Sequence, residues 1–488
     1  MPQLTRIHHT RTALTHPAAR ATWRNSFALR PADAIFAPAI KVGIAATLVL
    51  VAGGLLGQEQ LSGIAALGAL TSAFGRYQPY KRLGVMLVIV AAAMLVATGV
   101  GALMGASGVP TGLEILALAL IAGLAAPVFS AFRIMGPGVV ILVFAASAGA
   151  GYAHTFDAIP RVLAALGLGV VVGWMVAMAP ALIAPMGPAR LAVARAIAAV
   201  TGLGTTKDMD DAGTRQGAAL AAVRTARDSL ALSATHPQRR SARSVQLRAQ
   251  AAQLGLLLDE ADAVLELLKA GNHAGATSAL DGLAVHEAQL RTVFDARSVA
   301  APDGVSEAAA QTGAAKPQGM LSAARTALLS PSSAHQGMRM AAASALAGWA
   351  AVGLGLDHPL WASMGAVAAL QGLNYGMAVQ RGIQRVVGNV AGAVVAVVLL
   401  SLPLGFWPSV AMVIVFQVLA EIVVLKNYIL TTIAVTPMAL IMTGLGGHLG
   451  PDAAFSRVAD TLVGVVVGVL VAALTISLAD RHHLGSNS

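Results

Sequence analysis

Residues 83–105 read LGVMLVIVAAAMLVATGVGALMG, an apolar run without a single charged side chain. A helix rises about 1.5 Å per residue, so about 20 apolar residues cross the hydrocarbon core of a bilayer. We therefore predict a membrane-spanning helix in this run. Eleven further apolar runs occur at about 39–57, 61–75, 113–132, 135–151, 159–183, 338–356, 360–379, 386–402, 406–425, 428–445 and 458–479.

The composition indicates lipid rather than water as the main solvent. Hydrophobic residues make up 57% of the 488 residues and charged residues only 11%, whereas soluble domains carry about a quarter of their residues as charges. Cysteine is absent, which excludes disulfides, a thiolate nucleophile and a cysteine metal site. The sequence also contains no Walker A, His-Glu-x-x-His or dinucleotide-binding motif. We therefore predict that the chain is not an enzyme and holds no cofactor or metal.

The net charge of +10 fits a membrane topology better than a nucleic-acid partner. Basic residues gather on one side of the predicted spans, together with the basic N-terminus and the middle of the chain. The opposite connections carry mainly acidic residues, among them Glu114, Asp157, Asp357 and Asp452. Because positive loops stay in the cytoplasm, we predict twelve crossings of the bacterial inner membrane with both termini inside. No nucleic acid is expected as a partner.

Charge density divides the chain into six regions. Residues 187–335 carry charges every few positions, and Leu254, Leu258 and Leu265 recur there at helical spacing, which predicts a bundle of amphipathic helices. The predicted regions are a cytoplasmic basic arm that lies on anionic headgroups (1–35), a first six-helix membrane half (36–186), a cytoplasmic helical bundle (187–298), a flexible linker (299–335), a second six-helix half (336–480) and a cytoplasmic tail (481–488).

The two membrane halves resemble each other. The pair Gly68-Ala69 has a counterpart in Gly365-Ala366, and Gly169-x-x-x-Gly173 has one in Gly464-x-x-x-Gly468. Both halves have six crossings and begin on the same side, which predicts a parallel repeat about an axis along the membrane normal. The predicted fold is an all-α membrane protein with two such six-helix halves and a cytoplasmic helical bundle between them.

The second and eighth apolar segments are candidates for a binding site. Short, glycine-interrupted segments at matching positions of two repeats point to the substrate site of a transporter. The second segment is short, and the eighth contains Gln371, Asn374 and Tyr375 among its glycines. We predict that these three residues line the site. The alternative is that both segments are ordinary short or tilted helices.

Arg381 and Arg385 are the candidate anion-binding residues. They are one helical turn apart and can share a face, and a guanidinium group presents a planar fork of donors to a carboxylate. Lys81 and Arg82 are their first-half counterparts. The alternative is that all four are anchors of cytoplasmic loops.

Two acidic residues lie within apolar runs. Glu421 can carry a coupling proton or pair with Arg385 or Lys426, because carboxylates inside a membrane are costly and usually functional; the alternative is a structural ion pair. Asp460 follows Arg457 by three residues, and we expect these two side chains to pair with each other.

The second half carries a recognisable signature. Its residues are Trp361-x-x-x-Gly365-Ala, Gln380-Arg381-Gly-x-x-Arg385-x-x-Gly388-Asn-x-x-Gly392, then Glu421, Tyr428, Thr436-Pro437 and Arg457-x-x-Asp460-Thr461-x-x-Gly464. This pattern resembles the fusaric-acid-resistance family of aromatic acid exporters, and the plant aluminium-activated malate transporters carry a similar one.

This resemblance implies export of small aromatic or carboxylic acids. Together with the repeat and the absent ATPase motif, it predicts a secondary transporter, proton-driven, with a small organic anion as substrate and the lipid bilayer as surroundings. Two alternatives stay open: a passive organic-anion channel, and a membrane scaffold or envelope-assembly factor acting through the cytoplasmic bundle. A periplasmic adaptor subunit is compatible with an exporter, although no residue points to one.

Overall fold

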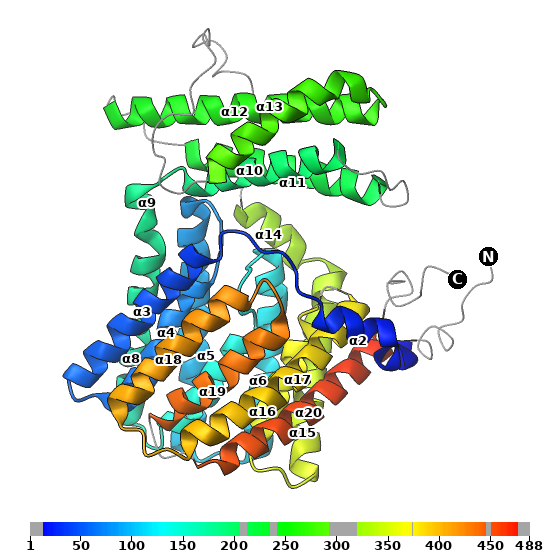
Figure 1. The fold of residues 1–488 in the computed structure, drawn as a ribbon. Helices are drawn as coiled ribbons and strands as arrows, with labels where there is room; N and C mark the ends of the chain where they lie inside the picture. The colour runs from blue at the N-terminus through cyan, green and yellow to red at the C-terminus, as the bar shows by residue number, and fades with distance from the viewer. Residues whose placement is uncertain are drawn as a thin grey trace. The chain divides into compact units, whose positions relative to one another are not determined.

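The computed structural model describes residues 13–204, 212–234, 242–291, 320–372, 374–445 and 450–476. Every regular element in these ranges is a helix (Figure 1). The chain forms two compact units. The first comprises residues 1–76, 86–177 and 320–488, and the second comprises residues 77–85 and 178–319. The predicted tail, 481–488, lies outside the described residues.

Each predicted apolar run coincides with a helix, although the bounds shift by several residues. The runs of the first half correspond to α3 (Phe36–Leu55), α4 (Glu59–Ala69) with the short η2 (Leu70–Ala73), α5 (Tyr80–Ser107), α6 (Thr111–Ala131), α7 (Val140–Tyr152) and α8 (Ala158–Met178). Those of the second half correspond to α15 (Pro331–Gly353), α16 (Pro359–Leu370), α17 (Tyr375–Leu400), α18 (Phe406–Val423), α19 (Tyr428–Gly444) and α20 (Asp452–Leu474).

Seven helices of the described chain are long and apolar enough to cross a membrane: α3, α5, α6, α8 with its extension α9 (Pro180–Ile183), α17, α18 and α20. Three shorter helices, α7, α16 and α19, are also apolar. The protein is therefore a multi-pass membrane protein. The predicted number of twelve crossings remains a prediction, because α4, α7, α16 and α19 are shorter than the hydrocarbon core and α15 is less apolar.

In the second half, one break between helices comes earlier in the sequence than predicted. The sequence placed a loop at residues 380–385, whereas α16 ends at Leu370 and α17 begins at Tyr375. Asn374 caps α17, because its side-chain oxygen accepts a hydrogen bond from the Met377 N–H at 2.8 Å. Gly372 fits against the first turn of α17, where an added Cβ would lie 2.5 Å from the Ala378 nitrogen. The glycine-interrupted segment is thus broken, and Arg381 and Arg385 lie on a helix.

Helices also occur in two regions outside the predicted membrane halves and bundle, the basic arm and the flexible linker. The arm forms η1 (His16–Ala18) and α2 (Arg20–Phe27). In the predicted linker 299–335, residues 320–328 form α14 (Met320–Leu328) and α15 already begins at Pro331. Ser330 caps α15 through its side chain and Pro331 occupies the first turn, which is where proline favours a helix start. Residues 299–319 lie outside the described part of the chain.

The second unit contains a helical bundle with its own core. Its helices are α10 (Gly187–Gly204), α11 (Ala212–Ala234), α12 (Ala242–Lys269) and α13 (His273–Arg291), which pack against one another. Leu254, Leu258 and Leu265 of α12 are buried in this core, as their helical spacing predicted. The predicted helical character of this region is confirmed, and its cytoplasmic location remains a prediction.

Glycines allow the helices of the first unit to pack backbone against backbone. A Cβ on Gly464 of α20 would overlap the carbonyl oxygen of Ala362 in α16, and one on Gly169 of α8 would overlap that of Ala65 in α4. Hydrophobic driving force between helices is weak in lipid, so close van der Waals packing at small residues takes its place. These four helices depend on glycine for their separation.

Replacement of Gly464 with alanine is expected to destabilise the protein. The added methyl group meets backbone atoms that cannot rotate away, and overpacking of this kind costs about 1–3 kcal/mol. The matched control is Gly353→Ala at the end of α15, where a Cβ meets no atom within 4 Å. Thermal unfolding of the purified protein in detergent should show a lower melting temperature for Gly464→Ala only. Equal melting temperatures would contradict the close packing of α16 on α20.

Candidate functional site

Polar and charged side chains gather inside the second half, where the apolar helices α16, α17, α19 and α20 meet. We call this set the polar cluster. Its buried members include two arginines, an aspartate and an asparagine, all of them expensive to place inside a membrane unless they are partnered or functional. The polar cluster consists of Trp361, Arg381, Arg385, Asn389, Tyr428, Thr436, Arg457, Asp460 and Thr461.

Arg381 and Arg385 converge on one aromatic side chain. The guanidinium group of Arg385 donates a hydrogen bond to the Tyr428 hydroxyl at 3.1 Å. The Arg381 guanidinium carbon lies 4.5 Å from the centre of the same ring, within the range of a cation–π interaction. Arg385 is only 9% exposed, and its Nε has no hydrogen-bond partner among the described residues. The two predicted arginines therefore contact the same residue, Tyr428, which is the first residue of α19.

The three residues predicted in the broken segment have different roles. Asn374 is used as the cap of α17, and the Tyr375 hydroxyl donates to the backbone oxygen of Ala13 at 2.6 Å. Gln371 lies beside Arg381 and can take two amide orientations. In one its oxygen accepts from Arg381 at 3.4 Å, and in the other from the N–H groups of Val139 and Val140 at 3.0 and 2.9 Å. We favour the second, because it satisfies two donors at shorter distances.

Asn389 links the helices in the middle of the polar cluster. Its side-chain oxygen accepts from the Thr436 hydroxyl at 2.6 Å, and its amide nitrogen donates to the Thr461 hydroxyl and, at 3.4 Å, to the Arg457 carbonyl. Gly388 and Gly392 flank it on α17 and allow α19 to approach, since a Cβ on Gly388 would lie 2.6 Å from that of Thr432. The asparagine and the glycines of the sequence signature thus serve one contact.

The hydrogen-bonding environment of Asp460 differs from the predicted one. Within the part of the chain that the structure describes, both of its carboxylate oxygens are buried without a hydrogen-bond partner, although Arg457 lies one turn away on α20. The expected hydrogen-bonded Arg457–Asp460 pair is therefore not formed, although the two charges still interact through space. Arg457 instead places its guanidinium carbon 4.8 Å from the ring centre of Trp361. An ionised carboxylate without donors costs several kcal/mol to bury, so Asp460 is suited to receive a proton or a donor from a ligand.

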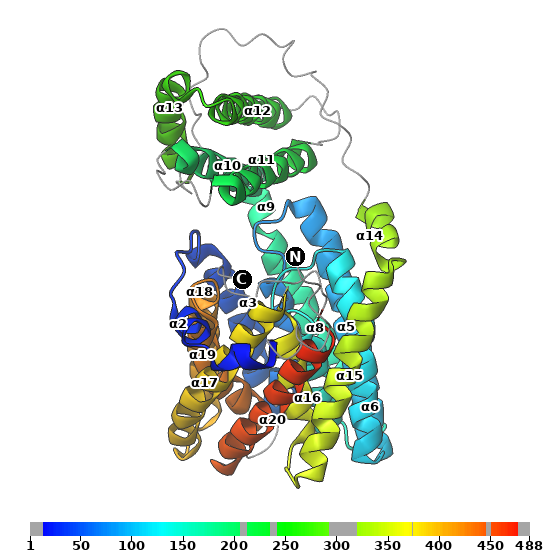
Figure 2. The same ribbon diagram turned by 90° about the vertical axis from the view of Figure 1, so that its right-hand side faces the viewer.

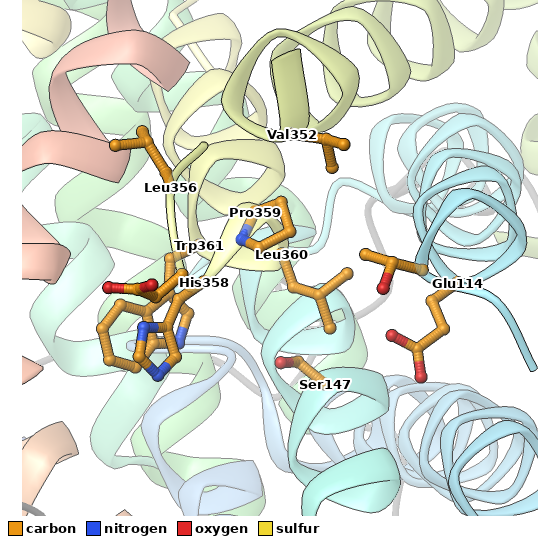
Figure 3. A pocket seen from close by; sticks show the side chains of 10 residues that line it. Glu114, Ser147, Val352, Leu356, His358, Pro359, Leu360 and Trp361 are labelled. Carbon is orange, nitrogen blue, oxygen red and sulfur yellow. The ribbon is translucent and has the colours of Figure 1, made fainter. Parts of the chain in front are cut away.

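A cavity of about 370 Å³ adjoins the Trp361 end of the polar cluster (Figure 3). The His358 ring stacks on Trp361, with 4.3 Å between ring centres and 10° between planes. The pKa of His358 lies below its ordinary value, chiefly because burial disfavours the charged ring. The nearby Asp357 opposes this shift and Arg457 adds to it. Glu114 lies on the other side of the cavity from His358 and Trp361. The lining residues are Thr111, Glu114, Ser147, Val352, Leu356, Asp357, His358, Pro359, Leu360 and Trp361.

Glu421 forms an ion pair that the sequence did not reveal. Arg76, from the segment after η2, donates to the Glu421 carboxylate and also to its backbone oxygen, the latter at 3.3 Å. Both side chains are about one-tenth exposed, at 11% and 12%. Arg385 donates to Tyr428 instead. Sequence spacing could not connect these two residues, because they are 345 positions apart.

Lys81 and Arg82 lie in the first turn of α5, in the second unit. Their role as counterparts of Arg381 and Arg385 stays a prediction.

Spanning helices around a buried polar cluster define a multi-pass membrane protein of a kind suited to transport. Residues 342–471 match the family described as fusaric acid resistance protein-like, which confirms the resemblance seen in the sequence signature. The matched segment contains every member of the polar cluster, and the family is one of membrane transport and efflux. No match was found among curated proteins or among solved structures.

Removal of either partner of the Arg76–Glu421 pair is expected to destabilise the protein more than removal of both. A single change leaves an uncompensated charge in a largely buried site, at a cost on the order of 3 kcal/mol. We expect Arg76→Gln and Glu421→Gln each to lower the free energy of unfolding in detergent, and the double variant to recover part of the loss. Additive losses would show that the two side chains do not interact.

Proposed function

We propose that this protein is a secondary transporter that exports small organic acids, in particular aromatic carboxylates, across the inner membrane. The observation that carries the proposal is a pair of buried arginines inside an apolar helix bundle, Arg385 and Arg457, whose Nε groups have no hydrogen-bond partner in the described ranges of the chain. Guanidinium N–H groups are suited to a carboxylate. The rings of Tyr428 and Trp361 beside them favour an aromatic acid over an aliphatic one.

The polar cluster also extends far enough along the helices to form a path for a substrate. From the start of α17 it runs through Arg381, Arg385 and Tyr428 to Asn389, and then to Arg457 and Trp361 beside the cavity. If the basic connections are cytoplasmic, Arg381 and Arg385 collect anions at the inner end. The cavity, whose lining includes Glu114 and Asp357, is then the outer end. Its negative charge favours release of an anion over its return.

The architecture supports two repeated halves, because the order of helix lengths recurs. The short α4, of 11 residues, precedes the long α5, of 28, as the short α16, of 12, precedes the long α17, of 26. The contacts are reciprocal as well: α3 packs on α18, and α15 packs on α6. Under a twofold relation of the halves these are the same contact, and the α4–α8 and α16–α20 glycine contacts are another. A parallel repeat of this kind is common among secondary transporters.

Asp460 is the stronger candidate for the coupling proton. Glu421 already has a cation, Arg76, that stabilises its ionised form, whereas both oxygens of Asp460 are buried without a donor. Asp460 also lies one turn from Arg457 on α20, so a proton on one and an anion on the other can influence each other. We propose that Asp460 binds the proton that drives export.

One observation favours a different function. The second unit forms a separately packed helical bundle with its own hydrophobic core, as expected of a domain that binds a protein partner in a scaffold. In that case, cells that express the correctly inserted protein should show no efflux of any acid.

The Arg381→Gln/Arg385→Gln variant is expected to weaken transport without removing the protein from the membrane. Each charge-assisted hydrogen bond contributes about 1.5–3 kcal/mol, so the apparent affinity for a carboxylate should fall about tenfold or more. The measurement is efflux of a panel of radiolabelled aromatic and aliphatic acids from cells. Lys426→Gln, which removes a neighbouring cation outside the polar cluster, is the control. Wild-type efflux from the double variant would mean that the arginines are only anchors.

Asp460→Asn is expected to uncouple export from the proton gradient. The amide cannot exchange a proton, so accumulation against a gradient should stop while downhill exchange of the acid continues. The test compares efflux with and without a protonophore, with Asp452→Asn at the exposed start of the same helix as control. If wild-type efflux ignores the protonophore and carries single-channel currents, the protein is a passive channel and the coupling proposal fails.

A further inference from the structure

We propose that residues 13–30 form an interfacial arm that binds anionic lipid headgroups through one face of α2. Arg20, Trp23, Arg24 and Phe27 are spaced three and four residues apart, so they share a helix face, and all four are exposed. The opposite face is buried. This inference rests on the arm alone and is independent of the proposed transport function.

The buried face fixes the arm to the membrane helices. The side chain of Gln384 in α17 donates to the Ser26 carbonyl at 2.8 Å, and that of Asn427, just before α19, donates to the same oxygen at 3.0 Å. Gln380 donates to the Asn25 carbonyl at 2.9 Å. Thr22 and Ser26 are 5% and 0% exposed. Because α2 is held by side chains from α17 and by the residue that caps α19, its outward face has a defined direction.

The location of the arm indicates which molecules contact the exposed face of α2. The arm leads into α3, which begins at Phe36, and lies against the first turns of α17 (Figures 1 and 2). The Arg30 N–H donates to the Lys426 carbonyl, in the connection between α18 and α19, at 2.9 Å. The arm therefore lies where membrane helices begin and end. At that depth the neighbouring molecules are lipid headgroups.

The chemistry of the face matches an anionic leaflet. Trp23 and Phe27 are 43% and 53% exposed with ring centres 6.5 Å apart, and amphipathic rings of this kind settle at the headgroup level. Trp23 is held in place by a hydrogen bond from its indole nitrogen to the Pro17 carbonyl at 2.9 Å. Arg20 and Arg24 flank the rings with positive charge. Interleaved basic and aromatic side chains on one helix face are typical of a helix that lies in the interface.

The experiment uses the full-length protein in lipid nanodiscs. Because the sequence contains no cysteine, Ala28→Cys provides a single labelling site at an exposed position after α2, and an environment-sensitive fluorophore attached there reports on lipid contact. Phosphatidylglycerol with a nitroxide on its headgroup is titrated into a phosphatidylcholine background. Quenching is expected to saturate at a low mole fraction of phosphatidylglycerol, and nitroxide-labelled phosphatidylcholine should quench far less.

Arg24→Gln should raise the mole fraction needed for half-maximal quenching about fivefold, since each arginine near an anionic surface contributes on the order of a factor of five. Arg20→Gln/Arg24→Gln should raise it further. The matched control is Arg224→Gln, which removes one exposed arginine from α11 in the second unit. Equal quenching by the two lipids, or equal effects of Arg24→Gln and Arg224→Gln, would overturn the proposal. A response to an acidic soluble protein but not to phosphatidylglycerol would also overturn it.

Discussion

Two arginines buried among apolar helices constrain the rest of this structure. In lipid, the hydrogen bonds of the backbone are formed within each helix. The groups that are still costly to bury are therefore the charged side chains of Arg385 and Arg457. Each is placed against an aromatic residue, Tyr428 or Trp361, and Asn389 links the helices that carry them. These contacts require α17, α19 and α20 to lie close together. The glycines on their facing surfaces are the means by which the sequence permits that distance.

The two ends of the polar cluster have different surroundings. At the start of α17, polypeptide covers the helices, because the arm is bonded to Gln380, Gln384 and Asn427. At the start of α16, a cavity adjoins Trp361 and is lined by Glu114 and Asp357. Arg381 and Arg385 therefore lie near the covered end, whereas two carboxylates line the cavity at the other end, next to the Arg457–Trp361 contact. This asymmetry follows from where the chain places its charges rather than from any single residue.

Much of the candidate site could be predicted because the signature residues lie at helical spacing. Arg381 and Arg385 were expected to share a face, and they meet at Tyr428. The partners of the two acidic residues could not be predicted. Glu421 pairs with Arg76 from the other half of the chain, and Asp460 has no hydrogen-bond partner although a cation lies one turn away. Spacing along a helix gives the face of a residue, but side-chain direction and neighbouring helices decide which atoms it contacts.

The sequence by itself determined that this is a helical membrane protein, where its apolar segments lie, and which family its second half resembles. Apolar length and charge placement are local properties, and transfer from water to lipid depends on them directly. Tertiary structure alone decided the position of the break between α16 and α17, the fold of the arm and the ion pair between Arg76 and Glu421. The ion pair and the docking of the arm join segments distant in sequence, and at the break Tyr375 bonds to Ala13 of the arm. Only the packed helices bring the donors and acceptors of those segments within bonding distance.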